Sequence, residues 1–187
     1  MSMKKITPEF VRDIFYSGQF GFKSDLEVTT KIAFLVNNNY LVLSRVKIAT
    51  KEQYLATCSS PSTLSKYDEA SGGSPEHVAL KILGAAYIKN EYGVESIFEQ
   101  PFVGFIPDVQ SIDKHTICEC GHTDNPEKLF TYFKHIEVRF VIQIPYPDIT
   151  DTEIYGYEFQ AAPNLISFLE YESKGASQKI LDILNNR

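Results

Sequence analysis

The sequence lacks the features of a membrane or secreted protein. It contains no apolar run long enough to span a bilayer, and the opening MSMKKITPEF has two lysines but no apolar signal-peptide region after them. Cysteine is scarce, with only Cys58, Cys118 and Cys120, and an odd number argues against a secreted disulfide framework. We therefore expect a cytoplasmic protein with no membrane partner.

Basic residues are also in the minority. The sequence has 18 Lys and Arg and 24 Asp and Glu, which gives a formal net charge of −6. This balance argues against strong non-specific binding of nucleic acid, because phosphate contacts come from Lys and Arg. It is compatible with a local nucleic-acid groove, since carboxylates of a catalytic site count toward the total.

The chain is long enough for one sizeable hydrophobic core. It has 187 residues, of which 43% are hydrophobic. We expect a single domain over residues 1–187, made of an N-terminal extension (1–73), a central block (74–146) and a C-terminal helical segment (147–187).

The central block alternates helical and strand-like patterns. Ser74 and Pro75 begin a helix with apolar residues at helical spacing up to residue 92. Three strand-like runs follow at 94–103, 105–112 and 115–121. Asn125-Pro126 then opens a helix over 127–136, and residues 137–146 form a last strand.

Two carboxylates in this block are spaced for a shared site. Asp108 and Glu119 lie on consecutive predicted strands, which a turn near Asp113-Lys114 would pair. The two-residue period of a strand places Asp108 on the face of Gln110, and Glu119 on the face of Ile117. Two adjacent carboxylates repel each other unless a cation lies between them, and oxygen ligands favour Mg²⁺ or Mn²⁺.

The order of helix, three strands, helix and strand, with Pro107-Asp108 followed by Glu119, resembles the PD-(D/E)xK restriction-endonuclease-like nuclease superfamily over roughly residues 74–146. The resemblance implies an α/β fold. Its restriction-endonuclease-like core would be a helix, a three-stranded meander, a helix and a strand, with an N-terminal hairpin extension and C-terminal helices. It also implies that Asp108 and Glu119 bind Mg²⁺ or Mn²⁺, and that Glu76 on the first helix adds a third ligand.

The sequence departs from the family at the motif lysine. That lysine should follow the second acid by two residues, where this chain has Gly121. A displaced lysine could replace it from a neighbouring helix. Lys128, in the first turn of the second helix, is the first candidate and Lys81 is the second. The alternative for either residue is a solvated helix lysine.

Two functions follow from these observations. The first is a metal-dependent phosphodiesterase acting on DNA or RNA, with DNA favoured, and with Asp108, Glu119 and Lys128 as catalytic residues. The second is a catalytically inactive nuclease-fold protein that serves in binding or assembly. A homodimer is one such assembly, because the N-terminal hairpin could either extend the sheet of the core or form a dimer edge.

The flanking segments have their own predicted structure. Thr7 caps a helix over 7–15, and Asn37-Asn38-Asn39 joins strands at 31–36 and 40–48 into the hairpin. Two short amphipathic helices follow residue 163, with a core-facing stripe that includes Leu165 and Leu169.

A zinc site is an alternative in the third strand-like run. His115, Cys118, Cys120 and His122 offer four ligands within eight residues. The spacing is poor for one ion, because successive same-face residues of a strand lie about 6.6 Å apart. We therefore favour buried cysteines that pack as small hydrophobic residues.

Overall fold

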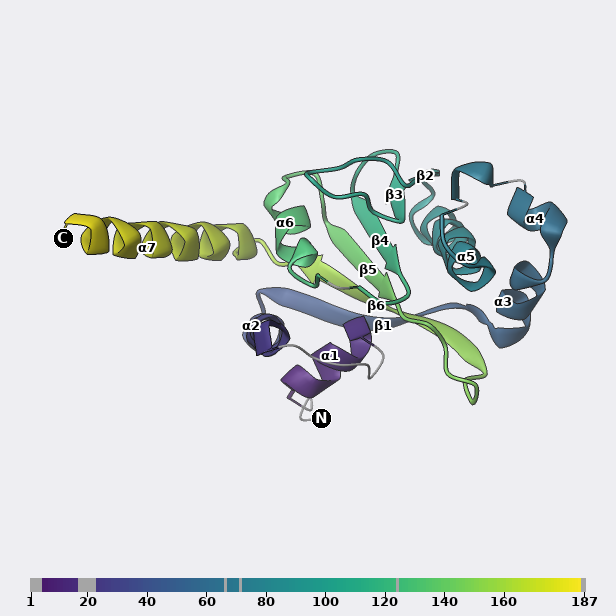
Figure 1. The fold of residues 1–187 in the computed structure, drawn as a ribbon, viewed down its shortest axis with the longest axis horizontal. Coiled ribbons are helices and arrows are strands. Elements are labelled where there is room, and N and C mark those ends of the chain that lie inside the picture. Colours follow the sequence, from purple (N-terminus) through teal and green to yellow (C-terminus); the bar gives the residue numbers. More distant parts are fainter. Residues whose placement is uncertain (1–4, 17–22, 66, 71, 124, 186–187) are drawn as a thin grey trace.

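The computed structural model describes residues 5–16, 23–65, 67–70, 72–123 and 125–185. It is a mixed α/β fold in which helices cover both faces of one six-stranded sheet (Figure 1). The strands are β1 (Leu41–Thr50), β2 (Ser96–Phe98), β3 (Val109–Ser111), β4 (Thr116–Cys120), β5 (Phe140–Ile144) and β6 (Glu153–Ala161). The helices are α1 (Pro8–Tyr16), α2 (Lys23–Asn37), α3 (Lys51–Cys58), α4 (Pro61–Ser65), the 3₁₀ turn η1 (Asp68–Ala70), α5 (Pro75–Tyr92), α6 (Lys128–Lys134) and α7 (Leu165–Asn185).

The strands lie in the order β1-β6-β5-β4-β3-β2. Strands β4 and β5 are parallel, and the other neighbours are antiparallel. The parallel pair follows from the helical crossover α6, because parallel neighbours need a connection longer than a hairpin. From α5 to β5 the elements follow the predicted order of helix, three strands, helix and strand.

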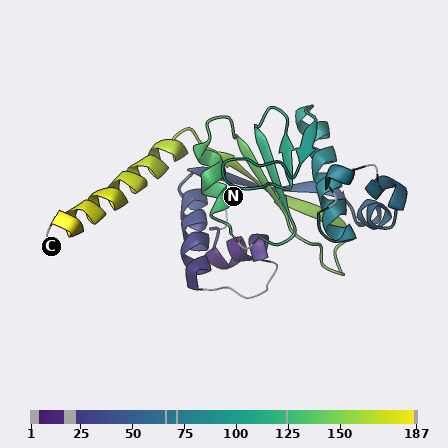
Figure 2. The ribbon, with the colours of Figure 1, turned by 45° about the horizontal axis from the view of Figure 1, so that its top comes forward.

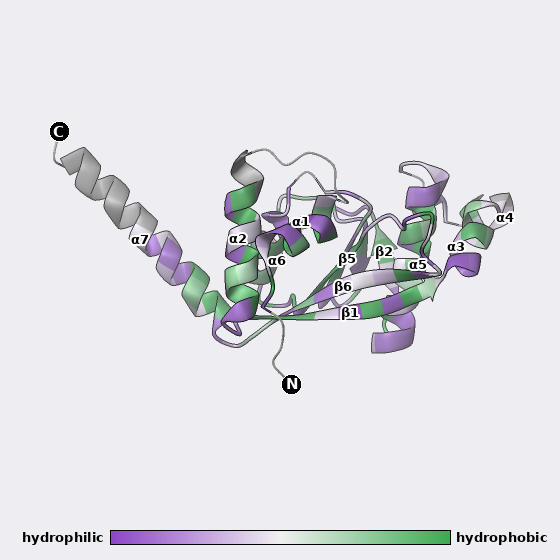
Figure 3. Ribbon diagram, turned by 90° about the horizontal axis from the view of Figure 1, so that it is seen from below, coloured by the Kyte–Doolittle hydropathy of each residue, from purple (hydrophilic) through white to green (hydrophobic). Residues whose placement is uncertain are grey.

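The sheet separates two hydrophobic cores. Helices α3 and α5 pack on one face, where Cys118 and Cys120 of β4 are buried. Helices α1, α2, α6 and the start of α7 pack on the other face, where Ile117 of β4 is buried. Alternation along β4 therefore decides which layer each side chain enters. Figure 3 shows hydrophobic and hydrophilic residues mixed along the edge strand β1.

Helix α5 begins and ends as its sequence predicts. The side-chain hydroxyl of Ser74 accepts a hydrogen bond from the backbone N of His77 at 3.3 Å, and Pro75 takes the first helical position. Gly93 ends the helix in a left-handed conformation (φ 71°), which glycine adopts without strain.

The predicted N-terminal hairpin is wrong. Residues 31–36 belong to helix α2, in which Val28, Ile32 and Leu35 are buried at the spacing of one helix face. The asparagine turn is real, since Asn39 has a φ of 59°, but it joins a helix to β1. Strand β1 matches the predicted strand at 40–48 and pairs with β6 instead of its chain neighbour.

The C-terminal segment also differs from its prediction. Residues 153–161 form strand β6, which lies between the edge strand β1 and β5, and the two expected short helices are one helix, α7. Leu165 and Leu169 are buried against the body of the protein as expected. Beyond them, α7 extends away from the body in Figures 1 and 2.

The strands around Asp108 are shorter than predicted. Strand β2 covers three residues of the run 94–103, and β3 covers three residues of the run 105–112. The segment between them is irregular, with positive φ at Glu99 and Val103. The turn into β4 is where the sequence placed it, with Lys114 at a φ of 63°.

Among the described residues, no helix has the length and apolar character needed to cross a lipid bilayer.

Candidate functional site

Asp108 lies immediately before the first residue of β3. One carboxylate oxygen, Oδ2, accepts a hydrogen bond of 2.7 Å from the backbone N of Cys120 on β4. Because Asp108 precedes the strand, the two-residue alternation does not fix the direction of its side chain. The carboxylate turns toward helix α5.

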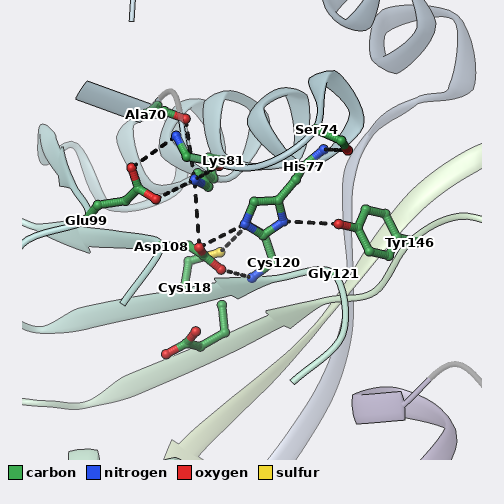
Figure 4. A network of polar contacts seen from close by, with 12 residues as sticks. Ala70, Ser74, His77, Lys81, Glu99, Asp108, Cys118, Cys120, Gly121 and Tyr146 are labelled. Carbon is green, nitrogen blue, oxygen red and sulfur yellow. Dashed lines mark hydrogen bonds and ion pairs between the residues drawn. The ribbon is translucent and has the colours of Figure 1, made fainter. Parts of the chain in front are cut away.

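Helix α5 supplies a histidine to this carboxylate. His77 Nε2 lies 3.0 Å from Asp108 Oδ1, and His77 Nδ1 lies 3.3 Å from the hydroxyl of Tyr146 (Figure 4). Both side chains are largely buried, at 19% exposure for His77 and 16% for Asp108. The imidazole therefore links the carboxylate to the phenol that follows β5.

Lys81 supplies a buried positive charge one helical turn after His77. Its side chain has no exposed surface, and its Nζ lies 2.8 Å from Glu99 Oε1 and 4.0 Å from Asp108 Oδ1. The same ammonium donates to the carbonyl oxygens of Ala70 and Gly72. A buried ammonium needs such compensation, and removing a partner from a buried ion pair costs about 3 kcal/mol or more.

Glu119 belongs to a second cluster around helix α6. Its Oε1 accepts a hydrogen bond from the hydroxyl of Tyr132, and its Oε2 lies 3.4 Å from Lys128 Nζ. Burial raises the pKa of Glu119, and the charge of Lys128 opposes that shift. Burial also raises the pKa of Tyr132, beside the Glu119 carboxylate.

The predicted convergence of Asp108 and Glu119 on one face is wrong. Asp108 interacts with α5, whose core contains Cys118 and Cys120, whereas Glu119 interacts with α6, whose core contains Ile117. The prediction assumed that Asp108 belongs to the strand, but β3 begins at Val109. The alternation of side chains along β3 therefore does not determine the direction of the Asp108 side chain. The two acids therefore lie in different layers of the fold.

The other predicted site residues divide between the two clusters. Lys128 lies beside Glu119, as expected of a displaced lysine, and Lys81 lies beside Asp108. Glu76 is exposed and its pKa is lowered by a hydrogen bond to the Ser74 side chain. The next residue, His77, takes the place beside Asp108 that we expected for Glu76.

Gly121 lies two residues after Glu119, where the resemblance predicts a lysine, and neighbouring side chains fill the space around it. It has a φ of 74°, and a Cβ added there would lie 2.6 Å from Cε2 of Tyr146. A side chain at residue 121 would thus meet the ring that also contacts His77.

The side chains as arranged do not fit a Mg²⁺ site. Both oxygens of Asp108 and both of Glu119 already have protein partners, and the cation beside Asp108 is Lys81. Within the described part of the chain, no three His, Cys, Asp or Glu side chains are grouped to hold a metal ion.

The four candidate zinc ligands do not share one site, because the cysteines and the two histidines have different contacts. Cys118 and Cys120 are buried in the α5 core with their sulfurs 3.9 Å apart, and burial raises the pKa of Cys120. His115 pairs with Asp113 at 3.1 Å, and His122 packs on the ring of Tyr146.

Sequence reasoning missed His77, Glu99 and Tyr132. A signal for His77 exists, because it is four residues before Lys81 and therefore on the same helix face. Tyr132 is four residues after Lys128 in the same way. Glu99 has no local signal, since it lies in the irregular segment after β2.

No protein family, curated protein or solved structure matches this chain.

Proposed function

We propose that the protein is a nuclease-fold relative that acts in binding or assembly and does not cleave phosphodiesters. The observation that carries the proposal is the buried ammonium of Lys81, within 4.0 Å of both Glu99 and Asp108. In a metal-dependent nuclease, carboxylates at this place would hold a divalent cation. Here an amino group of the protein neutralises them.

The fold part of the proposal is supported by the order of the elements. Helix α5, the antiparallel strands β2, β3 and β4, helix α6, and β5 parallel to β4 follow one another as in the restriction-endonuclease-like core. The acids Asp108 and Glu119 stand at the expected places in the sequence, and Gly121 replaces the lysine.

Titration with Mn²⁺ tests the proposal. In calorimetry we expect the wild type to show no saturable Mn²⁺ binding, because the ammonium of Lys81 already lies beside the carboxylates of Glu99 and Asp108. Glu76→Gln is the control for general loss of surface charge. Saturable Mn²⁺ binding by the wild type that is lost only in Asp108→Ala would contradict the proposal.

A gain of metal binding provides a positive test. In Lys81→Met the carboxylates of Glu99 and Asp108 lose their shared cation, so Mn²⁺ should bind this variant and raise its thermal midpoint. Lys89→Met changes an exposed lysine of the same helix and should gain nothing. If Mn²⁺ does not stabilise Lys81→Met, Lys81 does not stand in for a metal.

A metal-dependent phosphodiesterase is the second candidate. The contact of Lys128 with Glu119 favours it, because a displaced lysine would need that position. Because Asp108 and Glu119 contact different helices, they would share Mg²⁺ or Mn²⁺ only if Asp108 left His77 and the backbone N of Cys120 and turned toward α6. Mn²⁺-dependent cleavage of plasmid DNA that disappears in Asp108→Asn would establish this function over the first.

A further inference from the structure

A pocket of about 450 Å³ lies outside both acid clusters. It is formed by helix α1, strands β1 and β6, and the loop after β5. Its volume is in the range of small-molecule sites. The pocket is distinct from the Asp108 cluster, but Tyr146 belongs to both.

The charges of the pocket favour a positively charged ligand. Asp13, Asp148 and Asp151 line it together with one basic residue, Arg45, while Arg12 pairs with Asp13 at 3.8 Å and Lys51 bonds to the Asp148 carbonyl from outside the wall. The guanidinium of Arg45 already lies 3.6 Å from the ring of Tyr155. Asp13 is ion-paired and Asp151 Oδ2 accepts a hydrogen bond, whereas among the described residues the solvent-exposed carboxylate of Asp148 forms no ion pair and is available to a ligand.

The apolar part of the wall is aromatic. Phe10, Tyr146, Tyr155 and Tyr157 contribute rings, and Phe10 packs edge-on against Tyr157 with 5.9 Å between ring centroids. Aromatic faces attract cations through their negative quadrupole. Rings together with carboxylates therefore select a cation that carries an apolar body.

The acidic side of the pocket is held in place by its own hydrogen bonds. The backbone N of Asp148 donates to Asp151 Oδ2 at 2.7 Å, and the backbone N of Asp151 donates to the carbonyl of Asp148 at 3.2 Å. Lys51 Nζ donates to the same carbonyl at 2.6 Å. A site that is formed before binding loses little entropy on ordering.

We propose that this pocket binds a small organic cation, an alkylammonium or alkylguanidinium group. The charged head lies near Asp148, and the alkyl stem lies along the ring of Tyr157, because Arg45 already covers a face of the Tyr155 ring. The site does not depend on the chemistry at Asp108. Its ligand is a free amine or guanidine, or a basic side chain of a partner.

Calorimetric titration with n-butylguanidinium tests the site. We expect saturable binding that weakens about fivefold in Asp148→Asn, the loss expected for one partly screened charge contact. Asp68→Asn, an exposed aspartate away from the pocket, is the matched control and should bind as the wild type does. The uncharged n-butylurea should not bind.

Two further probes distinguish a free ligand from a partner's side chain, and a positively charged ligand from a negatively charged one. A capped Ala-Arg-Ala peptide that binds as tightly as n-butylguanidinium assigns the site to a partner's side chain, and a peptide that fails to bind assigns it to a free cation. Equal binding of n-butylurea, tighter binding of butyrate through Arg45, or no binding of n-butylguanidinium by the wild type would overturn the proposal.

Discussion

Burial distinguishes the two lysines near the acids. Lys81 has no exposed surface, whereas the side chain of Lys128 is 24% exposed and also lies 5.7 Å from the ring of Phe105. A fully buried ammonium that bonds to two carbonyls and a carboxylate is fixed in place. Lys128 retains access to solvent, so it is the lysine that could reach a ligand.

Glu119 should make the stability of the protein depend on pH. Burial raises its pKa in the folded state above the unfolded value, so the folded protein holds this proton more tightly. The resulting stabilisation is complete below the ordinary glutamate pKa and is lost as pH rises through the raised pKa. We expect Glu119→Gln to lack this loss.

Urea unfolding at a series of pH values measures the effect. Across that window the free energy of unfolding of the wild type should fall relative to Glu119→Gln, with a slope of at most about 1.4 kcal/mol per pH unit. The difference between the two proteins isolates Glu119 from other titrating groups. Parallel curves would mean that burial does not raise the pKa of this carboxyl.

At the scale of the element, helix α5 carries both His77 and Lys81 to Asp108, and its first turn depends on Ser74. Ser74→Ala removes the hydrogen bond to the His77 backbone and should lower the free energy of unfolding by about 1 kcal/mol. Chemical denaturation measures this loss. Ser167→Ala, an exposed serine of α7, is the control and should lose little. Equal stability of Ser74→Ala and wild type would remove the cap from the account of this helix.

The elements that the sequence predicted well are those with local signals. Helix α5 has a serine cap, a proline and a terminal glycine, and the turn into β4 contains Asp113, a common turn residue, although the positive φ falls on Lys114. Helix α2 was misjudged although Val28, Ile32 and Leu35 carry the helical period. Its apolar run KIAFLV also reads as a strand, which a short window cannot resolve.

The site was less predictable than the elements for a related reason. The sequence indicated Asp108, Glu119 and Lys128, but the direction of Asp108 depends on where β3 begins. That start is set by the irregular segment after Glu99, which has no local pattern. The ion pair of Lys81 with Glu99 joins α5 to this segment, so it follows from tertiary packing.

At the scale of the whole molecule, the segments before and after the central block each add one strand, β1 and β6, to the same sheet. Strand β1 pairs with β6 over its length, and β6 pairs with β5 of the central block. Helices α1 and α2 cover the face on which Ile117 and Val141 are buried. The central block therefore depends on residues from both flanking segments.

A fragment of residues 74–146 should consequently fail to fold. It would expose the apolar face of β4 and β5 and leave an edge of β5 unpaired. Two-dimensional NMR of the fragment should give poorly dispersed amide signals, with the full chain as the control. A dispersed, cooperative fragment would show that the block is an independent domain.

The contact between Gly121 and Tyr146 limits which amino-acid substitutions residue 121 tolerates. A lysine at residue 121 would collide with the ring at 2.6 Å and take up a left-handed φ, so that single substitution is disfavoured in the present background. Replacing Tyr146 by a smaller residue first would open the space, but it would also remove the partner of His77 Nδ1. A lysine at residue 121 therefore requires a change at residue 146 as well, and that change costs His77 one of its two side-chain hydrogen-bond partners.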